Sequence, residues 1–347
     1  MAEPVRKILF ISDTSSNPKK LYLDQMPKLA KGFVRRGHDV RQLSYCGLLS
    51  QLSPFKSRTL TRVLYKRKTD EIVCRFARHY QPHIILTGFA REMDATTLRM
   101  LREAAPGAVF FGIDGDPWPS DNPGRIATAG ELDILLATNN GSFLDEYRRA
   151  GVRKCVFMPN LCDPDIDHRY AVEPSCQCDI LWTGKVQHAS GLHTGDTVRQ
   201  DVLGLFAGRP DTRIFGCLGR PPIGGIDYLL AISGARIGIS INAINSIPLY
   251  HSDRFTHYAA CGTMVLAKRV PETERLMEDK KHVVYFDTPQ ECAELANWYL
   301  AHESERRQIA DSGMARCHAC FNPVAMCGYM LELMETGQYT APWGVFS

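Results

Sequence analysis

The sequence has no long uninterrupted apolar run. After the basic pair Arg6–Lys7, the apolar residues cover only Ile8–Ile11. A signal peptide needs roughly 7–15 apolar residues and a membrane helix about 20. We therefore expect neither a secretion signal nor a membrane span, and a protein that stays in the cytoplasm.

The sequence also lacks an excess of charge of one sign. Its 347 residues include 41 Lys and Arg against 38 Asp and Glu, a net charge of +3, which is too small to indicate a dedicated nucleic-acid binder. The 44% hydrophobic and 23% charged residues exclude a disordered chain. Because single cores stop growing near roughly 250–300 residues, the length favours two domains.

A complete metal-binding motif is missing as well. The twelve cysteines include the pairs Cys176/Cys178 and Cys317/Cys320. A structural zinc site needs four ligands, usually as two such pairs at a set spacing, and neither pair has an obvious partner. We expect reduced thiols and no metal.

The sequence is rich in short apolar runs that alternate with helical patterns. Such runs are typical of strands buried on both faces, and their alternation with helices favours parallel sheets. The predicted strands are Ile8–Ile11, Val40–Leu43, Ile84–Leu86, Val109–Ile113, Ile134–Ala137, Val156–Met158, Ile180–Trp182, Arg213–Phe215, Ile237–Ile241, Met264–Leu266 and Val283–Tyr285.

The opening segment predicts a strand, a loop, a helix and a strand. Apolar residues from Tyr22 to Phe33 recur at intervals of three and four, and Gly37 ends the helix. A polar segment with two prolines, Cys162–Cys178, has the character of a linker. We predict an α/β protein with Rossmann-like domains at residues 1–165 and 166–325, and a C-terminal helix within 326–347.

Residues 246–266 hold the strongest candidate site. Ser252 is a good N-cap, Asp253 suits the first helical turn, and Gly262 suits the position after the helix. Arg254 stands in the first turn, where a cation opposes the helix dipole. A bound anion would explain it, as would a nearby carboxylate. His257 shares its helix face.

Two further segments follow predicted strands, where ligands bind in open parallel sheets. Gly184 lets the backbone approach a ligand, and Lys185 supplies a charge for phosphate. Pocket candidates from the loop before residue 254 are Asn242, Tyr250 and His251.

The segment "SDRFTHYAACGTMVL", together with Glu305, Arg306, Arg307, Ile309, Ala310 and Gly313 of an "ERR-x-IA" stretch, carries a resemblance to a known family. Residues 178–325 resemble the C-terminal domain of group-1 glycosyltransferases, in particular the CgeB-like (spore-maturation-protein-like) branch. This resemblance implies the GT-B fold, with two Rossmann-like domains facing each other across a cleft.

The resemblance also implies how the site would work. The C-terminal domain would bind a nucleotide sugar, most often a UDP-sugar, and no cofactor or metal would be needed. Arg254 and Lys185 would neutralise the diphosphate, while His257 and Asn242 would orient the nucleoside or ribose. The family's Glu-x7-Glu pattern is absent, since Leu249 and His257 occupy those positions. The stereochemistry is therefore not predicted.

The N-terminal half would present the acceptor. Asp13 and Asp116 follow predicted strands and are candidates for a general base in an inverting transfer. Turn or cap roles are equally open to them. The basic stretch 56–78 is either a solvated helix face or a contact with a membrane surface or an anionic acceptor.

Two other functions remain open at this point. A nucleotide-sugar epimerase would use the same scaffold without an acceptor. A non-catalytic partner subunit would keep the fold without turnover, which the missing Glu pair allows.

Overall fold

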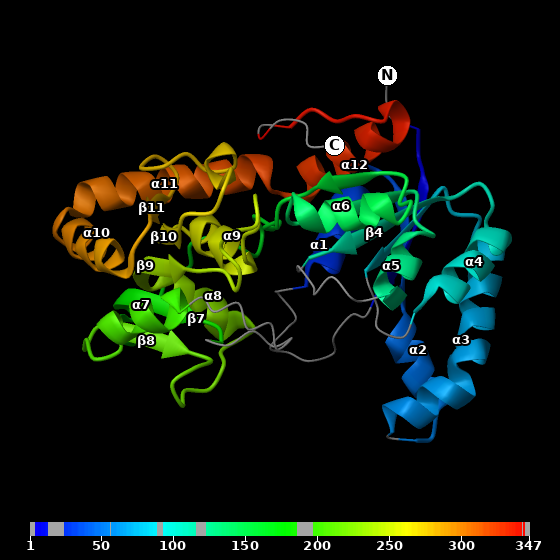
Figure 1. Cartoon of the computed structure of the whole chain (residues 1–347), viewed down its shortest axis with the longest axis horizontal. Coiled ribbons are helices and arrows are strands. Elements are labelled where there is room, and N and C mark those ends of the chain that lie inside the picture. The colour runs from blue at the N-terminus through cyan, green and yellow to red at the C-terminus, as the bar shows by residue number, and fades with distance from the viewer. Residues whose placement is uncertain are drawn as a thin grey trace.

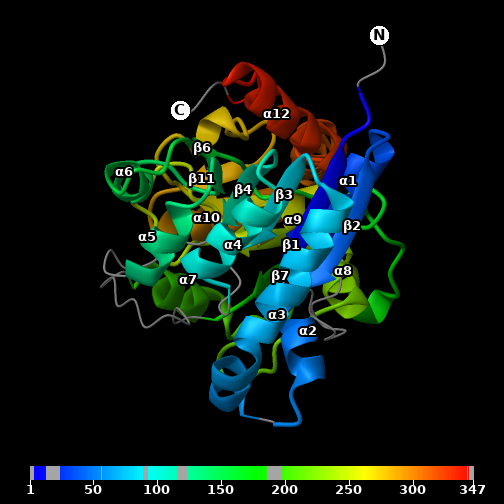
Figure 2. The same ribbon diagram turned by 90° about the vertical axis from the view of Figure 1, so that its right-hand side faces the viewer.

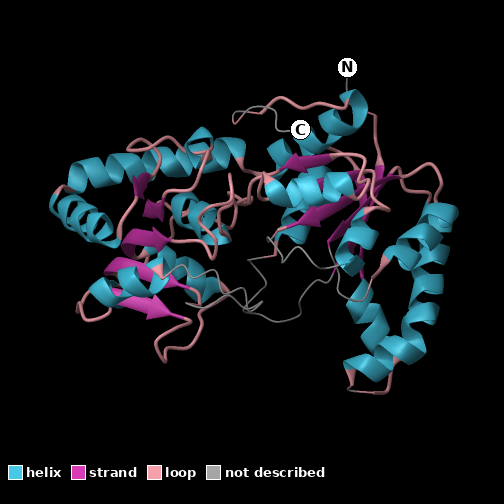
Figure 3. Ribbon diagram, viewed as in Figure 1, coloured by secondary structure: helices cyan, strands magenta, loops and turns pink. Residues whose placement is uncertain are grey.

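Two parallel β-sheets, each covered by helices, make up this computed structural model (Figures 1 and 3). It describes residues 4–12, 24–55, 57–88, 93–115, 123–185, 197–341 and 343. Sheet A has the strand order β2-β1-β3-β4-β5-β6, and sheet B has the order β11-β10-β9-β7-β8. The two-domain α/β fold predicted from the alternating apolar runs is confirmed.

All eleven predicted strands are present, and their ends differ from the predicted ones by at most two residues. Their bounds are β1 Lys7–Ser12, β2 Asp39–Ser44, β3 Ile84–Gly88, β4 Val109–Asp114, β5 Ile134–Ala137 and β6 Cys155–Phe157 in sheet A, and β7 Cys178–Thr183, β8 Thr212–Phe215, β9 Ala235–Ser240, β10 Met264–Lys268 and β11 Val284–Phe286 in sheet B.

The helices cover the sheets and connect their strands. They are α1 Gln25–Arg35, α2 Tyr45–Leu52, α3 Arg58–Tyr80, α4 Ala95–Ala104, α5 Pro123–Ala129, α6 Ser142–Arg149, α7 Val198–Phe206, α8 Ile226–Ser233, α9 Asp253–Ala260, α10 Pro289–Ala301, α11 Glu303–Cys320 and α12 Pro323–Thr336.

Strand β1 shows why sheet A is buried on both faces. Ile8 and Phe10 pack in a cluster with α1 and α12, whereas Leu9 and Ile11 pack on the opposite face with α3 and α4. All four side chains are fully buried. A parallel sheet covered by helices needs such continuous apolar runs rather than alternation.

The last helix returns to the N-terminal domain. α12 packs against α1, where the Cys327 Sγ contacts the carbonyl of Leu29 and Gly32 leaves no room for a Cβ beside Pro323. In Figure 1, α12 (red) lies over the same half of the molecule as α1.

The predicted linker is anchored rather than loose. Lys28 of α1 forms an ion pair with Asp167 at 2.6 Å, and both side chains are almost completely buried. Lys31 binds Asp163 and Asp165. These ion pairs fix the segment after β6 to the first helix of sheet A.

No helix in the described ranges is both long and apolar enough to cross a membrane. All twelve cysteines are free thiols, as expected. Within the same ranges, no group of three or more His, Cys, Asp and Glu side chains is arranged to hold a metal ion.

Candidate functional site

The carboxyl end of sheet B carries a guanidinium that is held in a fixed place. Arg254, in the first turn of α9, donates from Nη1 to the carbonyl of Thr183 and from Nη2 to that of Ile241, at 2.8 Å. Its Cζ lies 4.8 Å from the ring centroid of Trp182, a cation–π contact. Arg254 therefore joins the ends of β7 and β9.

Arg254 keeps N–H groups available beyond these bonds. A guanidinium has five N–H donors, and the two carbonyls use two of them. Its Nε is buried without a hydrogen-bond partner, so the N–H groups left for a ligand are those on Nη1 and Nη2. Among the described residues the guanidinium bonds to these carbonyls and forms no ion pair with a carboxylate. A nearby carboxylate, one of the two explanations offered for Arg254 from the sequence, is thus not found among the described residues.

Gly184 makes this arrangement possible. It follows β7 with a φ of +122°, and a Cβ at this position would collide with Nη1 of Arg254. Its carbonyl accepts a hydrogen bond from the Trp182 indole at 3.0 Å. Lys185, the next residue, is exposed at the same edge. The backbone at Gly184 is therefore shaped around the guanidinium.

A second guanidinium at this edge was missed by the sequence analysis. Arg199, in the first turn of α7, donates to the carbonyl of Ile241 at 3.0 Å and to that of Lys185 at 3.2 Å. Two cations thus converge on one carbonyl oxygen. A cation in the first helical turn was the signal used for Arg254, and the same signal applies to Arg199.

The loop before α9 is organised by Asn242. Its Nδ2 donates to the carbonyl of Tyr250 at 2.7 Å, and its Oδ1 accepts from the backbone N–H of Ser252 at 2.8 Å. Both Asn242 and Tyr250 are buried. This loop sets the start of α9, and therefore the position of Arg254.

The N-terminus of α9 also meets the N-terminal domain. Asp253 is exposed and accepts from Gln25 of α1 at 2.9 Å, and Gln25 also donates to Asn160 at 2.6 Å. Ser252 is the N-cap residue by its backbone, but its buried Oγ has no hydrogen-bond partner. The starts of α1 and α9, each following a central strand, lie together.

The two histidines of this region are part of the core. His257 is 1% exposed and packs edge-on against Tyr228. His251 is equally buried, and its Nδ1 lies 2.9 Å from the carbonyl of Leu249. Burial lowers the pKa of both imidazoles. This geometry gives no support to a ribose-binding role for His257, and it argues for neutral packing residues.

The predicted catalytic bases, Asp13 and Asp116, lie outside the described residues. The neighbouring Asp114, at the end of β4, is buried and accepts hydrogen bonds from Arg125 and Tyr147 at 2.9 and 2.6 Å. A carboxylate held in this way fixes α5 and α6 to the sheet. It does not present a free base.

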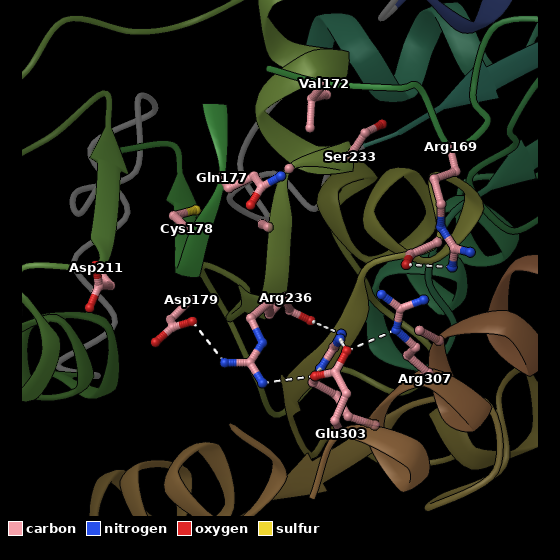
Figure 4. Close-up of a pocket in the computed structure, with 15 residues that line it drawn as sticks. Arg169, Val172, Gln177, Cys178, Asp179, Asp211, Ser233, Arg236, Glu303 and Arg307 are labelled. Carbon is pink, nitrogen blue, oxygen red and sulfur yellow. Dashed lines mark hydrogen bonds and ion pairs between the residues drawn. The ribbon is translucent and has the colours of Figure 1, made fainter. Parts of the chain in front are cut away.

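The opposite edge of sheet B contains a cavity of about 410 Å³ (Figure 4). Glu303 is bound there by three guanidiniums, those of Arg236, Arg306 and Arg307. These contacts lower the pKa of the Glu303 carboxyl, with the hydrogen bond from Arg306 as the largest cause. Arg306 belongs to the "ERR-x-IA" stretch, so this motif has a structural role here.

The comparison with protein families finds a match in the second half of the chain. Residues 198–332 match the family model described as "Glycosyl transferase-like". The segment includes Arg199, Arg254 and the whole of α9. No curated protein matches the chain.

Solved structures share the fold over nearly the whole length. Sucrose-phosphate synthase from Thermosynechococcus elongatus has a TM-score of 0.62 at 15% identity, covering 95% of this chain and 98% of that one. Anabaena Alr3699/HepE, solved with UDP-glucose, has a TM-score of 0.62 at 14% identity, covering 95% of this chain and 100% of that one. A glycosyltransferase from Rickettsia africae has a TM-score of 0.60 at 13% identity, covering 96% of this chain and 99% of that one. The chain shares the two-domain GT-B fold with these structures.

Proposed function

We propose that this protein is a nucleotide-sugar glycosyltransferase of the CgeB-like branch, acting in the cytoplasm without a metal. The observation that supports this most directly is the fixed guanidinium of Arg254 beside the bare backbone of Gly184. It stands within the segment that matches the glycosyltransferase-like family. A UDP-sugar is the donor that we expect, because Anabaena HepE was solved with UDP-glucose.

In this proposal the two guanidiniums bind the donor diphosphate. Arg254 uses the N–H groups that the carbonyls leave available, and Arg199 and Lys185 add positive charge at the same edge. Cations that are already in place stabilise the charge that develops on a leaving diphosphate without reorganisation. Carbonyl groups and Trp182 hold Arg254 in position before any ligand arrives.

The remaining predicted residues have supporting roles. Asn242, Tyr250 and Ser252 set the start of α9, while His251 and His257 pack beneath it. Asp253 joins the domains through Gln25. Asp13 or Asp116 remains our proposed base for activating an acceptor hydroxyl.

Calorimetric titration with UDP tests donor binding, with Arg254→Ala as the diagnostic variant and Arg209→Ala as the control. Arg209 lies in the same domain and contacts Phe206 and Asn297 instead. We expect binding to the wild type and the control but strong loss in Arg254→Ala. Absence of UDP binding to the wild type would contradict the assigned donor.

Turnover assays then separate the three candidate functions. A transferase releases UDP from UDP-glucose only when an acceptor is present. An epimerase interconverts the donor without an acceptor, and a non-catalytic subunit binds UDP but shows neither reaction.

A further inference from the structure

The hairpin formed by α2 and α3 projects beyond sheet A and forms the lowest part of the molecule in Figures 1 and 2. α3 has 23 residues, so at about 1.5 Å per residue it is roughly 35 Å long. Its C-terminal half packs on the sheet through Val73 and Ala77. Its N-terminal half extends past the sheet, and this surface plays no part in the site described above.

Exposed apolar side chains gather at the end of this hairpin. Phe55, Leu60, Val63 and Leu64 are 46%, 49%, 74% and 58% exposed. Residues 60, 63 and 64 share one helix face because they are three and four positions apart. We call these four residues the apolar tip. Single exposed apolar residues are ordinary, but four within ten positions mark an interaction site.

Basic side chains continue the same face towards the C-terminus of α3. Arg67 follows Leu64 by three positions, and Arg75 and Arg78 extend the row, with Lys68 beside it; all four are exposed. The one carboxylate on the row, Glu71, binds Arg67 at 3.2 Å. The row of five therefore carries a net charge of +3, and we call it the basic row.

The inner side of the hairpin is fixed to the domain by contacts that involve neither the apolar tip nor the basic row. Buried Asp70 accepts hydrogen bonds from Tyr45 of α2, from Lys66 at 2.7 Å and from Thr97 of α4 at 2.9 Å. Lys66 also binds Asp94 at 3.2 Å. The outer face is thus free to serve another purpose, and changes there leave the hairpin anchored.

We infer that this face docks on an anionic lipid bilayer, with the apolar tip entering the acyl region and the basic row contacting headgroups. The order along the helix carries the inference. Apolar residues stand at the projecting end and cations stand behind them, so when the tip enters the hydrocarbon the cations follow on the water side, where the phosphates lie. Interfacial helices combine apolar burial with attraction to anionic lipid in this way.

Co-sedimentation with lipid vesicles tests the inference on the full-length protein. One set of vesicles contains phosphatidylcholine alone, and the other contains added phosphatidylglycerol. We expect binding to the anionic vesicles that weakens as salt is raised, and at least tenfold weaker binding to the neutral ones. Failure of the wild type to bind anionic vesicles, or equal binding to both sets, would overturn the inference.

Three variants connect binding to this face. The apolar variant Leu60→Ser/Val63→Ser/Leu64→Ser and the basic variant Arg67→Gln/Arg75→Gln/Arg78→Gln should each lower vesicle binding at least tenfold. The control Leu205→Ser/Ile226→Ser removes residues that are 41% and 45% exposed on the other domain, and it should bind as the wild type does. Full binding by the apolar variant would exclude the tip as the docking element.

The same variants separate other occupants of the face from a bilayer. UDP affinity should be unchanged in all three, which checks folding and keeps this test independent of the proposed donor site. If light scattering shows concentration-dependent association that the apolar variant abolishes, and vesicle binding is absent, the face is an interface between copies of this chain and the lipid proposal is wrong.

Discussion

Gly184 and Arg254 occupy complementary space at the carboxyl edge of sheet B: the missing side chain of the glycine is filled by the guanidinium of the arginine. The two residues are 70 positions apart, yet the φ of +122° at Gly184 and the bond from Arg254 to Thr183 depend on the same local geometry. Glycine is thus needed at this position for two reasons: the positive φ, and the lack of room for a Cβ beside Arg254.

Substitution of Gly184 by alanine therefore tests the site without removing a charge. The added methyl group must displace the guanidinium and strain the backbone, so we expect UDP affinity to fall at least tenfold and stability to fall by about 1–3 kcal/mol. Calorimetry and chemical denaturation measure the two effects. Gly204→Ala is the matched control, because Gly204 lies in α7 with open space around it. An unchanged UDP affinity in Gly184→Ala would remove this loop from the donor site.

Removal of either guanidinium should weaken diphosphate binding. For Arg254→Ala and for Arg199→Ala we expect a loss of about 1–3 kcal/mol in the free energy of UDP binding, the scale of a charge-assisted hydrogen bond. Arg254→Lys keeps the charge but loses the fork that joins Thr183 to Ile241, so it should recover only part of the affinity. Uridine, which has no phosphate, should bind all variants alike; a loss of uridine affinity would show that the arginines act on the base or ribose.

Much of the fold could be predicted because most of the strands are buried on both faces. Continuous apolar runs such as Ile8–Ile11 have no other stable location in a chain of this size, so pattern and structure agree. Ends were less accurate: the apolar spacing began the first helix at Tyr22, whereas α1 begins at Gln25, where Asp24 caps it.

The site was predicted less completely, because local sequence does not reveal what a side chain faces. His257 lies one turn from Arg254 in the sequence pattern, but the helix turns the imidazole towards Tyr228 and the core. Arg199 carried the same local signal as Arg254, a cation in the first helical turn, but its partner, the carbonyl of Ile241 just after β9, is 42 positions away. Only the assembled sheet brings these groups together.

The buried pair Lys28–Asp167 should be a major determinant of stability. Both side chains are at most 3% exposed, so removing one partner leaves an uncompensated buried charge. We expect Lys28→Met to lower the free energy of unfolding by about 3–5 kcal/mol. The double variant Lys28→Met/Asp167→Asn should recover part of this loss.

Denaturation curves measure these changes, with Arg41→Met as the control. Arg41 is 56% exposed and forms a surface pair with Asp39, so its removal should cost about 0–1 kcal/mol. A small effect of Lys28→Met would mean that the linker is not held by this pair.

The free energy of unfolding should decrease as the pH is lowered through the range in which histidine takes up protons. Burial lowers the pKa of His251 and His257 below 6.5, so the folded protein keeps both imidazoles neutral while the unfolded chain protonates them. The contribution of these two histidines to stability is therefore fully present above about pH 6.5 and is lost as the pH falls. The slope is at most about 1.4 kcal/mol per pH unit for each histidine. His257→Phe should reduce this slope, because it removes one of the two imidazoles that the fold keeps neutral. A slope that is identical in His257→Phe and the wild type would show that His257 is not held neutral by the fold.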